Sequence, residues 1–228
     1  MQNRYINPDS DGKFYELHEM ARTNCQDCKG CSACCRDMGD SIRLDPFDIW
    51  QMTRGLHETF GQLMESGKIA MTAENGFLIP YLRMSPGRLA CPFLNEEGRC
   101  SIHSFRPGIC RLFPMGRDFS QDRLVYICLD KLCPAVKSKI KVEKWIGIAE
   151  SRQYHEYIQQ WHTFRRNMQK MLAEAEAEEA RKLNLYIIGQ FYGCEYFEQE
   201  KFFPSFYKKV QTIYRAFGMD EIVIPDEK

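Results

Sequence analysis

Cysteine is the residue type in this chain whose number and spacing could do chemistry. The chain has 228 residues and eleven cysteines, and ten of these lie between Cys25 and Cys133. Five of them fall in one short stretch, Cys25-Gln-Asp-Cys28-Lys-Gly-Cys31-Ser-Ala-Cys34-Cys35. Thiolates at repeated C-x-x-C intervals can wrap around a metal centre, because each turn of such a loop brings another sulfur to it. The pattern therefore indicates metal ligation by cysteine.

Disulfide bonds are the alternative use of so many cysteines. An odd number of cysteines fits a framework of paired disulfides poorly. The stretch from Met1 to Ser10 has no apolar core followed by a small-residue cleavage site, so it does not resemble a secretory signal. We therefore expect a cytoplasmic protein, whose thiols stay reduced and are available to metal.

The arrangement of the first cysteines favours an iron-sulfur cluster, most simply a 4Fe-4S cluster, over zinc. Several successive C-x-x-C intervals resemble the loops of ferredoxins, whereas structural zinc sites more often take two cysteines from each of two separate loops. Proline follows both Cys91 and Cys133, and a Cys-Pro dipeptide also occurs at one cluster ligand of bacterial ferredoxins. This similarity is weak evidence, because proline is common after cysteine. Zinc remains the alternative metal.

The adjacent residues Cys34 and Cys35 raise the question of how many centres there are. Neighbouring side chains usually diverge and seldom serve one metal ion together, so this pair indicates two sites or one bridged cluster. A cube or a tetrahedral zinc ion takes four thiolates, and the number of cysteines is compatible with one or two centres.

The cysteine motifs occur in an order that resembles a known family. The motifs are Cys28-x-x-Cys31-x-x-Cys34-Cys35, Cys91-Pro-Phe-Leu, Gly98-x-Cys100-Ser-Ile-His, and Arg106-Pro107-x-x-Cys110-Arg111-x-Phe113-Pro114, followed by Cys133. From about residue 25 to residue 148 the chain resembles the YkgJ-type cysteine cluster family, whose CxxCxxCC domain is associated with chelation of zinc or iron. The resemblance implies eight metal ligands: Cys28, Cys31, Cys34, Cys35, Cys91, Cys100, Cys110 and Cys133. Cys25 and Cys128 are additional cysteines, which could complete a second site or be buried thiols.

Three functional hypotheses follow. The first is an iron-sulfur protein with a redox or cluster-assisted role, and the second is a non-catalytic zinc module with a structural or interaction role. The third rests on a more distant resemblance of the cysteine region to flagellin lysine N-methylases, which implies cluster-dependent methyl transfer to protein lysine. No glycine-rich S-adenosylmethionine loop is recognised in the sequence, and Cys25 to Cys35 contain no C-x-x-x-C-x-x-C loop.

Two arginines flank one of the candidate ligands. Arg106 and Arg111 bracket Cys110, where a guanidinium could offset the negative charge of a thiolate cluster or bind an anionic substrate. The alternative is an ion pair with Asp45, Asp48 or Asp118. His103 follows Cys100 closely, but we expect it to pack rather than to ligate metal.

Short elements must position these cysteines, and we expect an α+β fold. Asp45 and Pro46 predict the start of a helix that runs to about Arg54, after a short strand at Ser41 to Leu44. A second helix is expected at Thr59 to Glu65, and Asn75-Gly76 predicts the turn of a β-hairpin. Further expectations are a helical turn at about Phe14 to Met20, a turn between Cys91 and Cys100, one or two helical turns around Cys110, and a strand at Arg123 to Leu129.

The composition changes after about residue 142. Cysteines nearly vanish, and apolar periodicity predicts helices at 142–150, 152–180, 181–193 and 204–217. We therefore divide the chain into a cysteine-cluster domain, residues 1–148, and a helical extension, residues 149–228, packed on it.

Charge and hydropathy limit the classes of partner. Lysine plus arginine and aspartate plus glutamate both number 31, so no net positive field favours nucleic acid or an anionic membrane. No stretch approaches the length of apolar sequence that a membrane helix requires. An unidentified protein partner or substrate is the remaining expectation.

Overall fold

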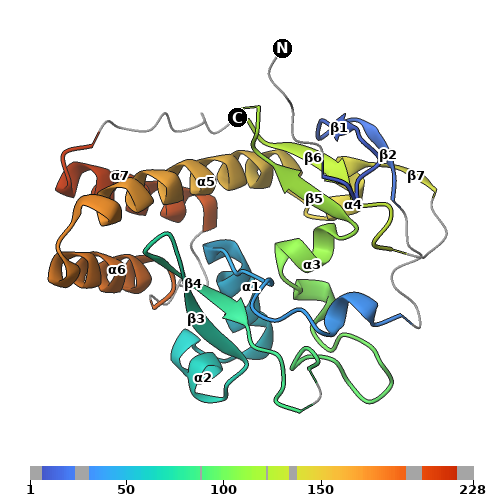
Figure 1. Ribbon diagram of the computed structural model, residues 1–228, viewed down its shortest axis with the longest axis horizontal. Helices are drawn as coiled ribbons and strands as arrows, with labels where there is room; N and C mark the ends of the chain where they lie inside the picture. The colour runs from blue at the N-terminus through green and yellow to red at the C-terminus, as the bar shows by residue number, and fades with distance from the viewer. Residues whose placement is uncertain are drawn as a thin grey trace.

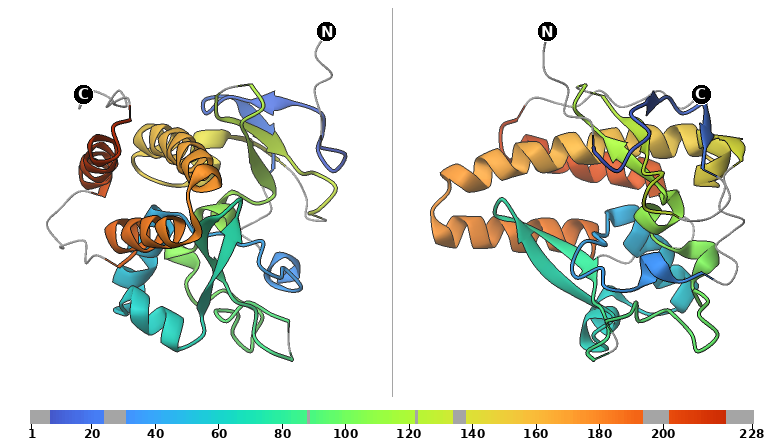
Figure 2. Two further views of the ribbon diagram at one scale, coloured as in Figure 1. Left: turned by 60° about the vertical axis from the view of Figure 1, so that its left-hand side comes forward. Right: turned by 45° about the vertical axis from the view of Figure 1, so that its right-hand side comes forward.

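The computed structural model has the α+β fold that the sequence predicts (Figure 1). It describes residues 7–23, 31–87, 89–121, 123–133, 138–193 and 202–219. Small antiparallel strand pairs and short helices make up the part before residue 142, and longer helices follow. Figure 2 shows the long helices α5 (Ser151–Glu174), α6 (Ala177–Phe191) and α7 (Phe202–Ala216) gathered on one side of the molecule.

The predicted hairpin is confirmed. Strands β3 (Ile69–Glu74) and β4 (Phe77–Leu82) pair antiparallel in register from Ile69 opposite Leu82 to Glu74 opposite Phe77. Asn75 and Gly76 both have positive φ, 49° and 79°, as a tight hairpin turn requires. The expected strand at Ser41 to Leu44 is reduced to one isolated bridge, between Arg43 and Tyr81, which lies beside β4.

The expected helical turn at Phe14 to Met20 is wrong. Residues there form strand β1 (Phe14–Tyr15) and the beginning of strand β2 (Met20–Arg22). The first joins a sheet of order β1-β6-β5, with β5 at Met115–Asp118 and β6 at Val125–Cys128, and the second pairs with β7 (Lys139–Lys141). These strands form because their partners lie far along the chain, so local periodicity could not predict them.

The predicted starts of the first two helices are confirmed. In helix α1 (Pro46–Leu56) the Asp45 side chain accepts a hydrogen bond from Asp48 N, and Asp48 accepts one from Asp45 N. Helix α2 (Phe60–Glu65) begins with the same kind of reciprocal cap between Thr59 and Gln62. Three shorter helical segments, near the cysteines, are η2 (Ala33–Cys35), η3 (His103–Phe105) and α3 (Gly108–Leu112).

The break predicted between the helices at 152–180 and 181–193 lies earlier in the chain, at Ala175 and Glu176. Helix α5 ends at Glu174, Ala175 is extended, and α6 begins at Ala177. The break lets α6 fold back, so that Phe191 packs against Trp161 and Phe164 of α5. A continuous helix would have carried the apolar face of α6 into solvent. Helix α4 (Val142–Ile146) is also shorter than the predicted 142–150, because Gly147 ends it with φ 65°.

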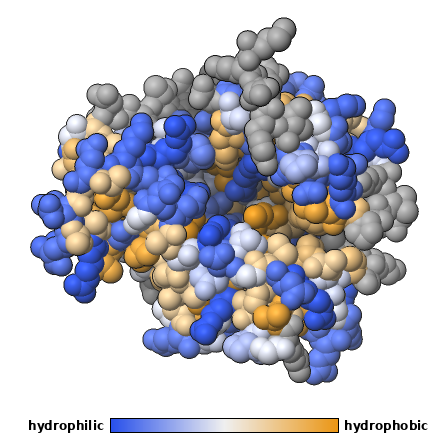
Figure 3. Space-filling view, viewed as in Figure 1, coloured by the Kyte–Doolittle hydropathy of each residue, from blue (hydrophilic) through white to orange (hydrophobic). Residues whose placement is uncertain are grey.

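One hydrophobic core joins residues from before and after the proposed boundary at residue 148. Phe47 of α1 contacts Tyr157 of α5 and Phe203 of α7, with ring centroids 6.1 Å and 5.5 Å away. The division into two domains stays a prediction. In the described parts of the chain, no helix is long and apolar enough to cross a membrane. Figure 3 shows hydrophobic side chains around the hollowed centre of one face and hydrophilic side chains along its edge.

Candidate metal centre

A small cavity of about 60 Å³ brings together cysteines from separate parts of the chain. Six of the described cysteines line it: Cys31, Cys34, Cys35, Cys91, Cys100 and Cys110. They come from the loop and turn of η2, from the two ends of the 91–100 segment, and from helix α3. Apolar side chains of Leu82, Leu94 and Ile102 complete much of the wall. The tertiary fold therefore converts dispersed cysteines into one sulfur-lined site.

Backbone hydrogen bonds fix the first cysteine loop against the second. Cys91 N donates to Cys35 O over 2.7 Å, and Asp37 N donates to Leu89 O over 2.7 Å. Arg36 and Ala90 form an isolated antiparallel bridge between these two contacts. Because the links are made by backbone atoms, the thiols of Cys34, Cys35 and Cys91 can face the cavity.

The segment from Cys91 to Cys100 forms the turn that its sequence predicts. Leu94 N donates to Cys91 O over 3.0 Å, and Asn95 N donates to Arg99 O over 2.9 Å. Leu94 and Cys100 form an isolated antiparallel bridge, which brings the end of the segment back beside its beginning. Both cysteines consequently reach the same cavity.

Helix α3 supplies Cys110 and is held by neighbours on two sides. Gly108 N donates to Asp48 Oδ1 of α1 over 2.6 Å, and Trp145 Nε1 of α4 donates to Leu112 O over 2.7 Å. An ion pair with Arg106 or Arg111 was the alternative expected for Asp48, and its hydrogen bond with Gly108 N of α3 was not predicted. That contact joins residues 60 positions apart, and the local sequence carries no signal for it.

Four thiols of the cavity, those of Cys34, Cys91, Cys100 and Cys110, are poorly suited to carry charge without a cation. A hydrogen bond with the Cys35 side chain, burial and the charge of Cys35 raise the pKa of Cys34. Burial raises the pKa of Cys91 to about 11, and it is also the main cause that raises the pKa of Cys100 and of Cys110. The neighbouring thiols add to each shift, since like charges repel. A bound metal cation would remove this penalty and ligate the thiolates.

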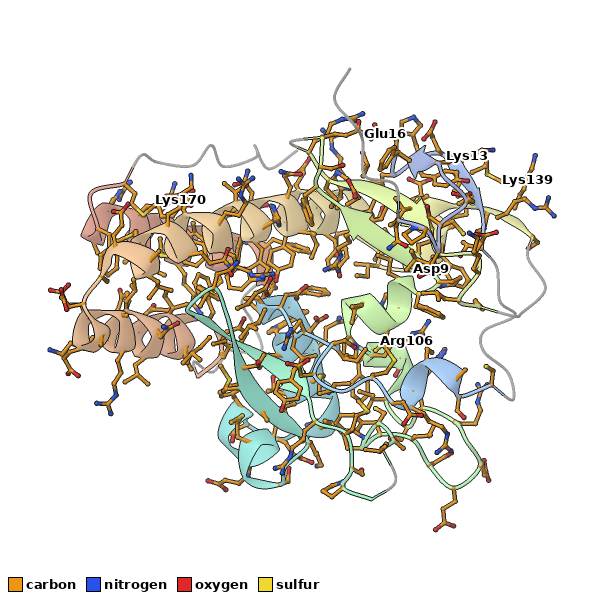
Figure 4. All side chains as sticks on the ribbon, viewed as in Figure 1. Asp9, Lys13, Glu16, Arg106, Lys139 and Lys170 are labelled. Atoms are coloured by element: carbon orange, nitrogen blue, oxygen red, sulfur yellow. The ribbon has the colours of Figure 1, made fainter. Side chains whose placement is uncertain are left out.

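Arg106 and His103 lie at the same cavity (Figure 4 labels Arg106 beside α3). Arg106 Nη1 lies 2.6 Å from His103 Nε2 and donates to His103 O over 2.8 Å. The charge of Arg106 partly offsets the rise in the pKa of Cys34 and Cys100. His103 was expected to pack, and the structure adds that its ring holds Arg106.

Arg111 takes a different position. Its Nη2 donates to Ser104 O over 2.9 Å, whereas its buried Nε has no hydrogen-bond partner among the described residues. The carboxylate of Asp45, one of the predicted ion-pair partners, lies 3.6 Å from Arg117 Nη1 instead. Burial is the main cause that lowers the pKa of Arg111, and the nearby charge of Arg106 adds to it.

Four predicted ligands are not placed at the cavity. Cys128 is buried on β6, where its thiol donates to Arg22 O over 3.5 Å, and neither it nor the half-buried Cys133 lines the cavity. Cys25 and Cys28 lie outside the described residues. Within the described ranges, no three cysteine, histidine or acidic side chains are grouped closely enough to hold a metal ion. The cavity nevertheless has the all-sulfur donor chemistry that suits zinc or iron.

Comparison with known proteins supports this interpretation of the site. The model of the family described as "CxxCxxCC: Putative zinc- or iron-chelating domain" matches residues 27–134. Comparisons with the curated proteins and with the solved structures found no match. The matched segment contains all six cysteines of the cavity. Residues 27–134 therefore resemble the CxxCxxCC domain, and metal binding is the property that this match supports.

Proposed function

We propose that the cysteine cavity holds an iron-sulfur cluster, most simply a 4Fe-4S cluster, and that the protein has a redox or cluster-assisted role. The observation that carries this proposal is the meeting of six cysteines at one cavity. One tetrahedral zinc ion uses four thiolates and leaves the others without a role. A cluster of several iron atoms, or a second centre, accounts for more of them.

The surrounding residues suit such a cofactor. The cluster would supply reversible acceptance of an electron. Leu82, Leu94 and Ile102 add apolar surface to the cavity wall, and charge interactions are stronger in less polar surroundings. Arg106 offsets part of the negative charge of the thiolates. A redox role also requires a protein partner or substrate to exchange electrons with, and a cytoplasmic location would keep the thiols reduced.

A structural zinc site is the second candidate. The charges of Cys34, Cys91 and Cys100 all raise the pKa of Cys110, so these four thiols lie near one another. Four thiolates are the complete ligand set of one structural zinc ion. In that case the additional cavity cysteines, Cys31 and Cys35, would either not bind the zinc ion or exchange with one of its four ligands. The protein would then act as a metal-stabilised interaction module.

Metal and acid-labile sulfide analysis of protein purified without air, with a visible spectrum, tests the two candidates. Iron with an equal amount of sulfide and a coloured protein that bleaches on reduction are expected for the cluster. Zinc in stoichiometric amount, with no sulfide after anaerobic reconstitution, would contradict the cluster and support the structural zinc site.

Two cysteine variants connect the metal to the cavity. Cys110→Ala removes a thiol from the cavity wall, and Cys128→Ala removes a buried thiol outside it. We expect Cys110→Ala to lose metal and Cys128→Ala to keep it. Equal metal content in both variants would show that the centre does not lie in this cavity.

A further inference from the structure

A buried charged network contacts helix α3, which carries the cavity residue Cys110. Asp45 and Asp48 are 5% and 1% exposed, although isolated carboxylates are seldom buried so deeply. Arg117 of β5 faces them, with Nη1 3.6 Å from Asp45 Oδ2, and its Nη2 donates to Tyr154 Oη over 2.5 Å. Tyr157 Oη donates to Asp45 Oδ1 over 3.0 Å. The network therefore joins α1, β5 and α5.

Within this network Asp48 is the residue that contacts the cysteine site. Its Oδ2 accepts from Asp45 N over 3.1 Å, and its Oδ1 accepts from Gly108 N over 2.6 Å. Gly108 is the first residue of α3, two positions before Cys110. The carboxylate of Asp48 thus holds the beginning of the short helix that presents this thiol.

The close approach of α3 to the network requires glycine at position 108. A Cβ atom there would collide with Tyr154 Oη and lie 2.6 Å from Arg117 Nη2. Only a residue without a side chain lets the backbone come near enough for the Asp48 contact. The sequence therefore provides both halves of the contact, a buried acceptor and a backbone donor that can reach it.

We propose that Asp48 is a positioning residue of the metal centre, which orients the Cys110 thiolate by holding Gly108 N. This inference rests on the proposed function. Side chains that hold a ligand-bearing element in this way are part of a metal site, because a displaced ligand binds metal poorly.

The test compares Asp48→Ala and Asp48→Asn with the control Glu74→Gln. Asp48→Asn can keep an acceptor for Gly108 N, whereas Asp48→Ala removes the acceptor. Glu74 forms an ion pair with Arg165 over 2.5 Å at the turn end of the β3–β4 hairpin, opposite the end that carries the cavity residue Leu82. Circular dichroism establishes which variants fold.

Metal retention is the first readout. We expect Asp48→Ala to weaken metal retention about 10-fold or more, the usual cost of losing a residue that orients a ligand. Asp48→Asn should retain more metal than Asp48→Ala, because its amide oxygen can still accept from Gly108 N. Glu74→Gln should match the wild type. Wild-type retention in both Asp48 variants would overturn the proposal.

The rate of alkylation of Cys110 in metal-free protein, followed by mass spectrometry, separates this inference from the proposed function. Faster alkylation in Asp48→Ala than in the wild type and Glu74→Gln is expected, with the rate at Cys128 unchanged. If the wild type holds zinc and no iron-sulfur cluster, the proposal of a cluster is wrong. Zinc retention and the alkylation rates then still test the role of Asp48. An unchanged rate in every folded Asp48 variant would overturn the positioning role even if the cluster is present.

Discussion

Cys91 N donates a hydrogen bond of 2.7 Å to Cys35 O, so two candidate ligands that lie 56 positions apart are joined by their backbones. This link fixes the first cysteine loop against the second without using either thiol. The chain is therefore shaped so that sulfur atoms from distant segments line one cavity. Disturbing the thiols should change metal binding more than it changes the surrounding fold.

Replacement of a cavity thiol outside α3 provides a direct test of that expectation. Cys91→Ala keeps the backbone link to Cys35 and removes one sulfur, so metal content should fall while the far-UV circular dichroism of the reconstituted protein changes little. Inductively coupled plasma analysis gives the metal content. Full metal content in Cys91→Ala would exclude Cys91 as a ligand.

Arg106 should tune the centre through its charge. Arg106→Gln removes a cation that offsets the negative charge of the Cys34 and Cys100 thiolates, so the reduction potential should move to a lower value. Arg106→Lys keeps a positive charge and should change the potential less. A potentiometric titration measures both variants, and an identical potential in Arg106→Gln and the wild type would contradict the charge-compensation role.

Removal of metal should lower thermal stability. A ligand at 100 times its dissociation constant stabilises the native state by about 2.7 kcal/mol. For a chain of this length that corresponds to a decrease in Tm of roughly 5–10 °C on chelation. Differential scanning calorimetry before and after chelation, and after metal is restored, measures the effect. A Tm that does not respond to chelation would show that the metal contributes little to folding.

His155 should make stability depend on pH. Burial lowers its pKa from the ordinary value of 6.5, so the unfolded chain binds a proton at this residue more readily than the folded protein does. The free energy of unfolding should therefore fall as the pH drops through about 6.5 and below. His155→Gln can retain a contact with Tyr126 and cannot titrate in this range.

Urea unfolding at several pH values compares His155→Gln with the wild type. Histidine titrates between roughly pH 7 and pH 5. Over this range the wild type should lose more stability than His155→Gln. Parallel curves for the two proteins would show that His155 is not responsible for the loss.

The helical layer should be essential to stability. Phe206 of α7 is fully buried and contacts Tyr157, Trp161 and Phe191. Phe206→Ala should cost about 3–5 kcal/mol, the usual range for a buried phenylalanine. Phe217→Ala, at a site that is 39% exposed, is the matched control and should cost much less. Chemical denaturation measures both, and equal costs would contradict the packing of α7.

Structural features that depend only on residues close together in the chain could be predicted from the sequence. Asp45 and Pro46 predicted the start of α1, and Asn75-Gly76 predicted the turn between β3 and β4, because a cap or a tight turn is made within a few residues. The C-x-x-C intervals and the Cys91–Cys100 segment predicted a cysteine metal site for the same reason. The family model that matches residues 27–134 supports metal binding there.

Tertiary contacts decided the rest. Phe14 and Met20 lie in strands rather than a helical turn because β6 and β7 provide their partners. The break before α6 was predicted, but its position differs from the prediction, and α6 folds back so that Phe191 packs on Trp161. Cys128 was also a candidate ligand, but it lies on strand β6, where its thiol donates to Arg22 O and does not line the cavity. The sequence by itself determined which side chains could bind metal. Their meeting at one cavity was decided by backbone contacts and burial between residues far apart in the chain, which local patterns do not encode.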